Sequence, residues 1–177
     1  GPTYAGTRHN VGFNVIELLA ERARIRLNQR KHQAVFDVVP VNGVPCVLVK
    51  PMTFMNLSGQ AVAPLLRSYN LGPEHLIVIA DELDLEVGDA KFTASGGAGG
   101  HNGHRSLIGS LGTKEYARIK IGIGKGGDET VNHVLGRFSP EEQHTLNDVV
   151  ARVANALEVA AVSGLAKGIE ELNRQRP

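Results

Sequence analysis

The chain has 177 residues, of which 42% are hydrophobic and 21% charged, a composition typical of one soluble globular domain. Its net charge of +1 at pH 7 excludes the strongly basic composition of a dedicated nucleic-acid-binding protein. Cys46 is the only cysteine, which excludes an internal disulfide and any multi-cysteine metal site. Because no apolar run approaches the roughly 18 residues that span a bilayer and no signal peptide opens the chain, we expect a cytoplasmic protein.

The first third of the chain predicts a helix followed by a β-hairpin. Apolar residues recur at helical spacing from Val11 to Ile25, and Asn10 is the expected N-cap. Ala34–Val41 and Val44–Lys50 are rich in β-branched residues and flank Asn42-Gly43, a strong signal for a two-residue hairpin turn. We therefore expect two antiparallel strands here.

The middle of the chain alternates helical and extended patterns. Leu76–Ala80 is a short apolar run, typical of a strand covered on both faces in a parallel sheet. Ser95–Gly103 carries five glycines in nine residues and predicts a loop. The other predicted elements are a helix over Asn56–Tyr69, a strand over Ala90–Ala94, a short helix over His104–Leu111 and a strand over Tyr116–Ile123.

The C-terminal part is predicted to be helical. Ser139 is a good N-cap, Pro140 fits the first helical position, and acidic residues follow in the first turn. The helix should run to about Val162, break at Gly164 and resume to near Arg174. The whole pattern predicts an α/β fold. We expect one domain over residues 1–177, a three-layer sandwich with a mixed, mostly parallel twisted sheet flanked by helices and a helical C-terminus.

Two charged runs have opposite signs. The segment from Arg22 to Lys31 has only basic charges, and the segment from Asp81 to Asp89 has only acidic ones. Each run can be a solvated surface. Separated fields of opposite sign can also steer a polyanion to one part of the surface.

Short polar segments precede two of the predicted helices and follow one predicted strand. His9 and Asn10 precede the first helix, Asn56 opens the second, and Asp81 follows the apolar strand, where ligands bind in open α/β sheets. A histidine oriented by a carboxylate can act as a base, and asparagines can orient a carbonyl or stabilise an oxyanion. Taken singly, each of these residues has an ordinary structural role, such as capping a helix. With no nucleophile elbow and Cys46 inside a strand, activated water is the expected attacker.

Two other patterns compete for a function. Gly122-x-Gly124-x-x-Gly127 follows a strand with the spacing of a dinucleotide fingerprint, but no strand follows the helical tail to complete a βαβ unit. The acidic residues of 81–86 could hold a divalent cation, although they lack the spacing and the glycine of a calcium loop. We therefore expect neither a dinucleotide nor a metal.

Taken together, the motifs resemble the bacterial-type peptidyl-tRNA hydrolases over essentially the whole chain. The matching segments occur in the family's order and spacing: TRHNVGF (7–13), KPMTFMNLSG (50–59), DELDLEVGDAKF (81–92), GGAGGHNGHRSL (96–107) and RIKIGIGKGG (118–127). Five motifs in the same order are far more specific than one glycine pattern. The resemblance implies hydrolysis of the ester between tRNA and a peptide or N-blocked amino acid, which recycles tRNA from abandoned translation.

The resemblance also implies roles for individual residues. His9 matches the base that activates water, and Asp81 matches the carboxylate that keeps this histidine basic. Asn56 and Asn102 match asparagines that bind and orient the substrate. Residues at the positions of Tyr4 and Phe54 line the cleft for the 3′ end and the peptide, and Met55 and His101 lie beside them in the motifs. The implied partner is peptidyl-tRNA, contacted at its 3′ CCA end and acceptor stem. No cofactor, metal, membrane or obligate protein partner is implied, and we expect a monomer.

Three departures from the family pattern bear on substrate binding. The family places an apolar strand ending in Gly-x-Asn-Pro-Gly just before Gly1-Pro2, and its asparagine helps to distinguish blocked from free aminoacyl-tRNA. Without that strand we expect lower stability and activity. Lys120 stands where arginine is common, and Thr93 stands where the family has a basic residue, with Lys91 as its substitute for contacting phosphate.

Two alternatives to the hydrolase remain at this point. One is a catalytically weak relative that binds RNA or protein, as do chloroplast splicing factors of the same family. The other is a nucleotide-binding protein that uses Gly122–Gly127.

Overall fold

The computed structural model describes residues 11–52, 58–96, 102–124 and 138–174. No helix within these ranges has both the length and the apolar character needed to cross a membrane. The elements, in chain order, are α1 (Val11–Arg22), β1 (Gln29–Lys31), β2 (Ala34–Val41), β3 (Val44–Pro51), α2 (Ser58–Ser68), the 3₁₀ turn η4 (Pro73–His75), β4 (Ile77–Glu82), β5 (Ala90–Thr93), α3 (Asn102–Leu111), β6 (Ala117–Gly122), α5 (Pro140–Ser163) and α6 (Leu165–Arg174).

The predicted hairpin is confirmed and belongs to a small antiparallel sheet of order β1-β2-β3. Asn42 and Gly43 both have positive φ, 50° and 83°, as a type I′ turn requires. Val41 therefore pairs with Val44, and the register runs on to the pair of Ala34 with Pro51. No hydrophobic pattern predicts β1, because its residues are all polar and exposed.

The second sheet has the order β4-β6-β5 and corrects the prediction of a mostly parallel sheet. Only β4 and β6 run parallel within the described residues; β5 pairs with β6 in the antiparallel sense. The reason is that the connection from β4 to β5 is a short loop and contains no crossover helix. The short loop that follows β4 turns the chain back, and β5 joins the far side of β6.

β4 also corrects the expectation of a strand covered on both faces. Among the described strands it lies at the edge of its sheet and pairs with β6 alone. Ile77, Val78 and Ile79 are accordingly half-buried, and only Ala80 in this apolar run is buried. An apolar run therefore indicates a strand here but does not reveal its place in the sheet.

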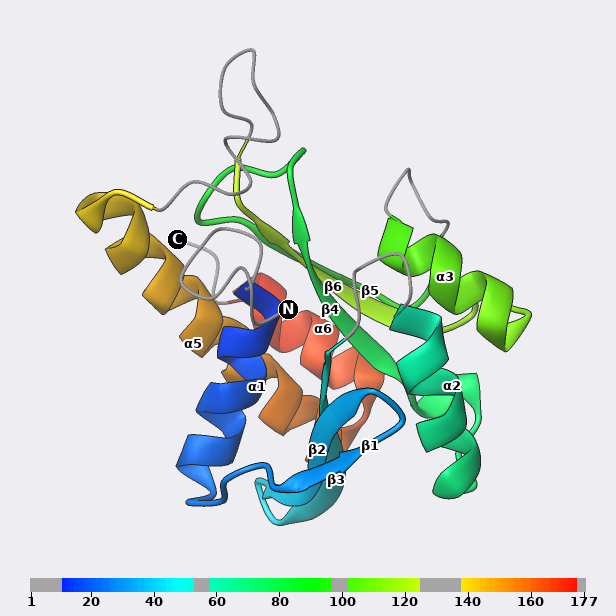
Figure 1. The fold of residues 1–177 in the computed structure, drawn as a ribbon. Coiled ribbons are helices and arrows are strands. Elements are labelled where there is room, and N and C mark those ends of the chain that lie inside the picture. Colours follow the sequence, from blue (N-terminus) through cyan, green and yellow to red (C-terminus); the bar gives the residue numbers. More distant parts are fainter. Residues whose placement is uncertain (1–10, 53–57, 97–101, 125–137, 175–177) are drawn as a thin grey trace.

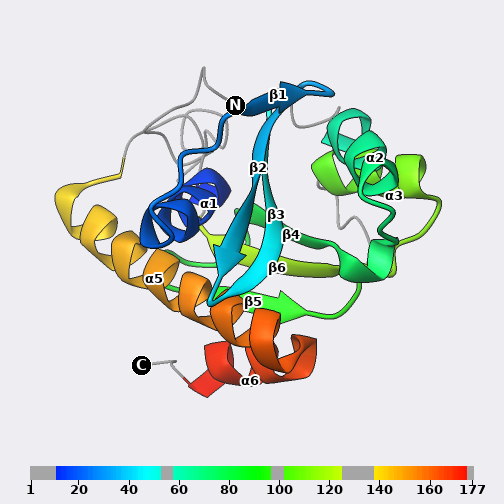
Figure 2. The same cartoon turned by 90° about the horizontal axis from the view of Figure 1, so that it is seen from below.

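The helices flank the strands on two sides, as the three-layer prediction requires. In both Figure 1 and Figure 2, α1 and α5 lie on one side of the strands and α2 and α3 on the other, with α6 beside β5. The main core joins α1 and α5 to both sheets and includes the fully buried Val15, Val39, Ile119, Ile121 and Val153. A smaller cluster packs Ala61 and Leu65 of α2 on Ala34 and Phe36 of β2.

The predicted C-terminal helices are confirmed. Ser139 caps α5 with a reciprocal pair of hydrogen bonds to Glu142, and Gly164, with φ of 96°, separates α5 from α6. α1 ends earlier than predicted, at Arg22. Arg24 adopts a φ of 57°, and the N–H groups of Arg24 and Ile25 donate to the carbonyls of Glu21 and Ala20. This is a Schellman ending made without the usual glycine, so the sequence does not mark it.

Candidate active site at the carboxyl end of strand β4

The carboxyl ends of the parallel strands β4 and β6 lie together, as expected for a ligand site in an α/β sheet. Asp81 is the penultimate residue of β4, is half-buried, and lies in register with Ile121 of β6. Ile121 is fully buried in the main core. Because side chains alternate along a strand, Asp81 and Ile79 share one face of the sheet, the face that carries α1 and α5.

The beginning of α1 lies directly on this part of β4. Gly12 approaches β4 so closely that a β-carbon at residue 12 would stand 2.7 Å from the carbonyl oxygen of Ile79. Only glycine permits this contact without a shift of the main chain. The chain therefore enters α1 beside the strand that carries Asp81. His9, Asn10 and Tyr4 of the predicted site precede α1 and lie outside the described residues.

A second close contact joins the amino-terminal parts of α2 and α3. The N–H of Gly59 donates to Oγ of Ser106 at 2.9 Å, and a β-carbon at residue 59 would fall 2.4 Å from the carbonyl oxygen of Ser106. The predicted asparagines belong to the starts of these helices: Asn56 precedes the first residue of α2 by two positions, and Asn102 lies in α3 itself. Asn102 is the first residue of α3, so this helix begins two residues before the predicted start at His104. Phe54, Met55, Asn56 and His101 lie outside the described residues.

The predicted phosphate contacts lie on the opposite face of the sheet from Asp81. Lys91 of β5 stands directly opposite Lys120 of β6, so both side chains point to the side of α2 and α3. Lys91 is exposed, whereas Nζ of Lys120 lies 3.8 Å from Oε1 of Glu82. The uncharged Thr93 stands opposite Arg118, which is buried. The structure thus brings the two lysines together but does not place them with Asp81.

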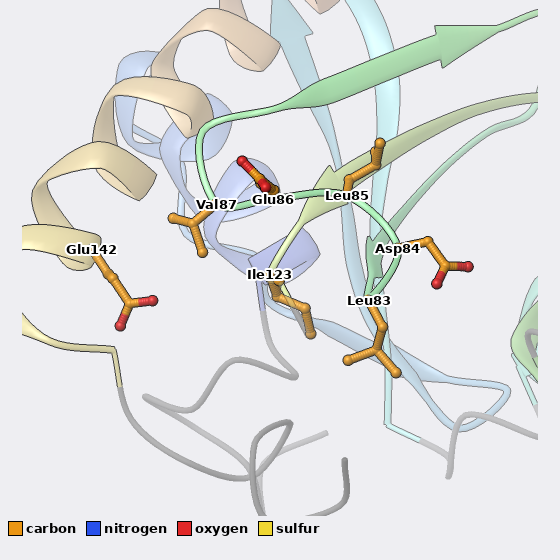
Figure 3. A pocket seen from close by; sticks show the side chains of 8 residues that line it. Leu83, Asp84, Leu85, Glu86, Val87, Ile123 and Glu142 are labelled. Atoms are coloured by element: carbon orange, nitrogen blue, oxygen red, sulfur yellow. The ribbon is translucent and has the colours of Figure 1, made fainter. Parts of the chain in front are cut away.

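A pocket of about 480 Å³ lies between the β4–β5 loop and the start of α5, as Figure 3 shows. Residues of the loop, Ile123, Gly124 and Glu142 line it, and three of the lining residues, Asp84, Glu86 and Glu142, carry a carboxylate. Three carboxylates repel a phosphate, so this pocket does not suit the RNA backbone. The acidic run of 81–89 is visible in the sequence. The pocket is not, because Glu142 is brought to this loop only by the tertiary fold.

Two glycines of the apparent dinucleotide fingerprint, Gly122 and Gly124, have a structural explanation. The N–H of Gly122 donates to the carbonyl of Asp89 at 2.9 Å, and that of Gly124 to the carbonyl of Leu85 at 2.8 Å. These glycines let the β4–β5 loop lie directly on the end of β6. Gly122 and Gly124 are therefore committed to a protein contact, whereas Gly127 lies outside the described residues.

Comparison with known proteins identifies the family. The family model for peptidyl-tRNA hydrolase matches residues 1–177. The chain belongs to the peptidyl-tRNA hydrolase family. The peptidyl-tRNA hydrolase of Chloroflexus aggregans is 45% identical over 177 residues, which cover 98% of this chain and 94% of that protein. That of Alkaliphilus metalliredigens is 41% identical over 175 residues, with the same coverage.

Solved structures of peptidyl-tRNA hydrolases agree with this assignment. A crystal structure of the enzyme from Acinetobacter baumannii superposes with a TM-score of 0.92 at 32% identity, covering all of this chain and 91% of that one. The resemblance inferred from the five motifs is therefore confirmed. These peptidyl-tRNA hydrolase relatives give no support to the alternatives of a splicing factor or a nucleotide-binding protein.

Proposed function

We propose that this protein hydrolyses the ester bond between tRNA and a peptide or N-blocked amino acid, and so recycles tRNA from abandoned translation in the cytoplasm. Its membership of the peptidyl-tRNA hydrolase family, at 41–45% identity to the relatives compared over nearly the whole chain, is the observation that carries the proposal. An ester has a better leaving group than an amide, so a positioned water and a base suffice without a covalent nucleophile.

In the proposed mechanism His9 is the base and Asp81 holds it. The imidazole takes a proton from water as the water oxygen attacks the ester carbonyl carbon. The bond from that carbon to the 3′ oxygen of tRNA then breaks, and the imidazolium returns the proton to the leaving oxygen. Asp81 stabilises the imidazolium between these steps.

The position of α1 supports the pairing of His9 with Asp81. Gly12 is in contact with Ile79, and Asp81 lies two residues along the same strand on the same face. His9 precedes Gly12 by three residues, a length of chain that spans at most about 11 Å. A chain of this length allows His9 to reach Asp81, which supports the proposed pairing.

The contact between α2 and α3 supports joint binding by Asn56 and Asn102. Asn56 precedes Gly59 by three residues, Asn102 precedes Ser106 by four, and Gly59 and Ser106 are hydrogen-bonded. In this proposal both amides orient the ester and donate to the oxyanion, a contribution worth about 10²–10³ in rate per donor. Tyr4 and Phe54 line the cleft for the 3′ CCA end and the peptide.

The proposed acceptor-stem contact is made by Lys91 and Lys120. The two lysines are cross-strand neighbours on one face, which suits two ammonium groups that approach phosphates of one backbone. Lysine acts here as a point charge and lacks the bidentate geometry of the arginine common in the family.

Release of N-acetyl-aminoacyl ester from tRNA tests the proposed chemistry. We expect His9→Ala to lower kcat by about 10²–10⁴-fold, and Asp81→Asn to lower it with the substrate KM little changed. Asp148→Asn is the matched control, since Asp148 is an exposed carboxylate on α5, with 72% of its side chain accessible. Equal rates for the wild type and His9→Ala would remove His9 from the mechanism.

A further inference from the structure

Three buried polar side chains lie in a row between the end of β5 and the start of α3. His104 is 2% exposed, and Tyr116 and Arg118 are each 1% exposed. His104 belongs to the first turn of α3, Tyr116 immediately precedes β6, and Arg118 lies in β6. Burying such groups is costly unless they are satisfied by one another.

The three side chains are joined by specific contacts. Nδ1 of His104 lies 2.7 Å from Oη of Tyr116, and the two rings are within 24° of parallel. The guanidinium carbon of Arg118 lies 4.2 Å from the centroid of the Tyr116 ring, a cation–π contact. Arg118 also donates through Nη2 to the carbonyl of Lys114 at 2.9 Å. We refer to His104, Tyr116 and Arg118 as the polar stack.

The polar stack contacts the described residues that flank the glycine-rich segment on both sides. Gly96 lies against Arg118, since a β-carbon there would stand 3.5 Å from Nε and 3.6 Å from Cδ and Cζ. On the other side, His104 is two residues after Asn102 in the same helical turn. The stack thus connects the residue at which the chain leaves the sheet region with the turn that carries Asn102.

We infer that His104, Tyr116 and Arg118 are positioning residues that set the place of Asn102 relative to the sheet. This inference rests on the proposed function, in which Asn102 binds the substrate. A buried hydrogen bond and an aromatic stack fix α3 both in rotation and in distance from β6. The polar stack therefore acts on the substrate only through Asn102, and its members touch no reacting atom.

Tyr116→Phe is the main test because it removes one hydroxyl and keeps the ring that contacts Arg118. If Asn102 shifts, the KM for N-acetyl-aminoacyl-tRNA should rise by roughly three- to ten-fold, the range of one buried hydrogen bond. A smaller folded fraction would lower kcat and leave KM unchanged. Tyr69→Phe is the matched control, because Tyr69 packs edge-on against Phe36 in the smaller apolar cluster and is not a member of the polar stack.

A double-mutant cycle with Asn102→Ala makes the test independent of stability. If the polar stack acts through Asn102, Tyr116→Phe should change KM less than two-fold once Asn102 is already alanine. The inference would be overturned if the KM changes of Tyr116→Phe and Asn102→Ala simply multiplied in the double variant. An unchanged KM in Tyr116→Phe would also overturn it. His104→Gln, which can still bond the hydroxyl, should retain more activity than His104→Leu. If Tyr116→Phe fails to fold, comparing these two His104 variants tests instead whether the hydrogen bond to Tyr116 matters for activity.

Hydrogen exchange separates this inference from the proposed function. If the wild type releases no ester, the proposed function is wrong, whatever the variants do. Amide exchange in the first turn of α3 should still be faster in Tyr116→Phe than in Tyr69→Phe if the polar stack holds that turn. Equal exchange in the two variants would show that the stack does not position α3.

Discussion

The α-carbon of Gly122 lies against the main chain of Glu86, and a β-carbon at residue 122 would fall 2.0 Å from the carbonyl oxygen of Glu86. The neighbouring N–H groups of Gly122 and Ile123 donate to the carbonyls of Asp89 and Glu82. The carboxyl end of β6 is therefore enclosed by the loop that follows Asp81. This contact fixes one side of the pocket in Figure 3 and holds the strand end that carries Asp81.

Gly122→Ala is expected to destabilise the protein by about 1–3 kcal/mol, because the obstructing atom is main chain and cannot rotate away. Urea unfolding measures the change. Gly109→Ala is the matched control: Gly109 lies within α3 with nothing within 4 Å of an added β-carbon, so this change should stabilise by about 0.5–1 kcal/mol. Equal stabilities for Gly122→Ala and the wild type would show that the loop moves aside freely.

Lys120→Ala and Lys91→Ala are expected to weaken tRNA binding by similar factors, irrespective of the tRNA sequence. Each change should also reduce the slope of log Kd against log salt by about 1, since each lysine contacts one phosphate in the proposed complex. Filter binding at several salt concentrations measures both quantities. Lys167→Ala is the control, because Lys167 is an exposed residue of α6 paired with Glu170. A salt slope unchanged in both variants would mean that these lysines do not touch phosphate.

Ser139→Ala is expected to cost about 1 kcal/mol of stability, because Oγ of Ser139 accepts from the N–H of Glu142 at 3.1 Å and caps α5. Glu142→Gln should cost less, since glutamine also completes a capping box. Thermal unfolding of the two variants measures this difference. If Ser139→Ala melts like the wild type, water replaces the cap and the capping box contributes nothing.

Burial raises the pKa of the Tyr116 phenol above its usual 10.0, against a smaller lowering by Arg118. The folded state therefore holds the phenolic proton more tightly than the unfolded state. The resulting stability is complete below pH 10 and is lost as the pH rises through the higher folded pKa. We expect the unfolding midpoint of the wild type to fall more steeply above pH 10 than that of Tyr116→Phe. Parallel curves for the two proteins would contradict this linkage.

Local signals in the sequence predicted those elements whose ends are marked by particular residues. Asn42-Gly43 fixed the hairpin register, and Ser139 and Gly164 marked the ends of α5. The end of α1 was not predictable because Arg24, rather than a glycine, adopts the left-handed conformation there. The direction of β5 and the edge position of β4 depend on pairing between distant residues, which no local pattern reveals.

In the candidate site, too, local motifs identify residues, whereas their spatial arrangement depends on contacts between distant parts of the chain. The motifs named Asp81, Lys91 and Lys120, but only the pleat of the sheet shows that the two lysines lie on the face opposite Asp81. The polar stack was not predicted, because His104, Tyr116 and Arg118 have no common spacing in the sequence. Their contacts join a residue of α3 to residues in and just before β6, which the tertiary fold alone brings together.

The edge strand β4 has a consequence for synthesis of the chain. Ile77 pairs with Ala117, about 40 residues further along, so β4 leaves the ribosome well before its partner strand exists. The β2–β3 hairpin, whose strands are neighbours in the chain, can close during this interval. At that stage the described part of the nascent protein is the small sheet followed by an apolar strand whose described partner does not yet exist. That strand is the segment most open to intermolecular pairing until β6 emerges.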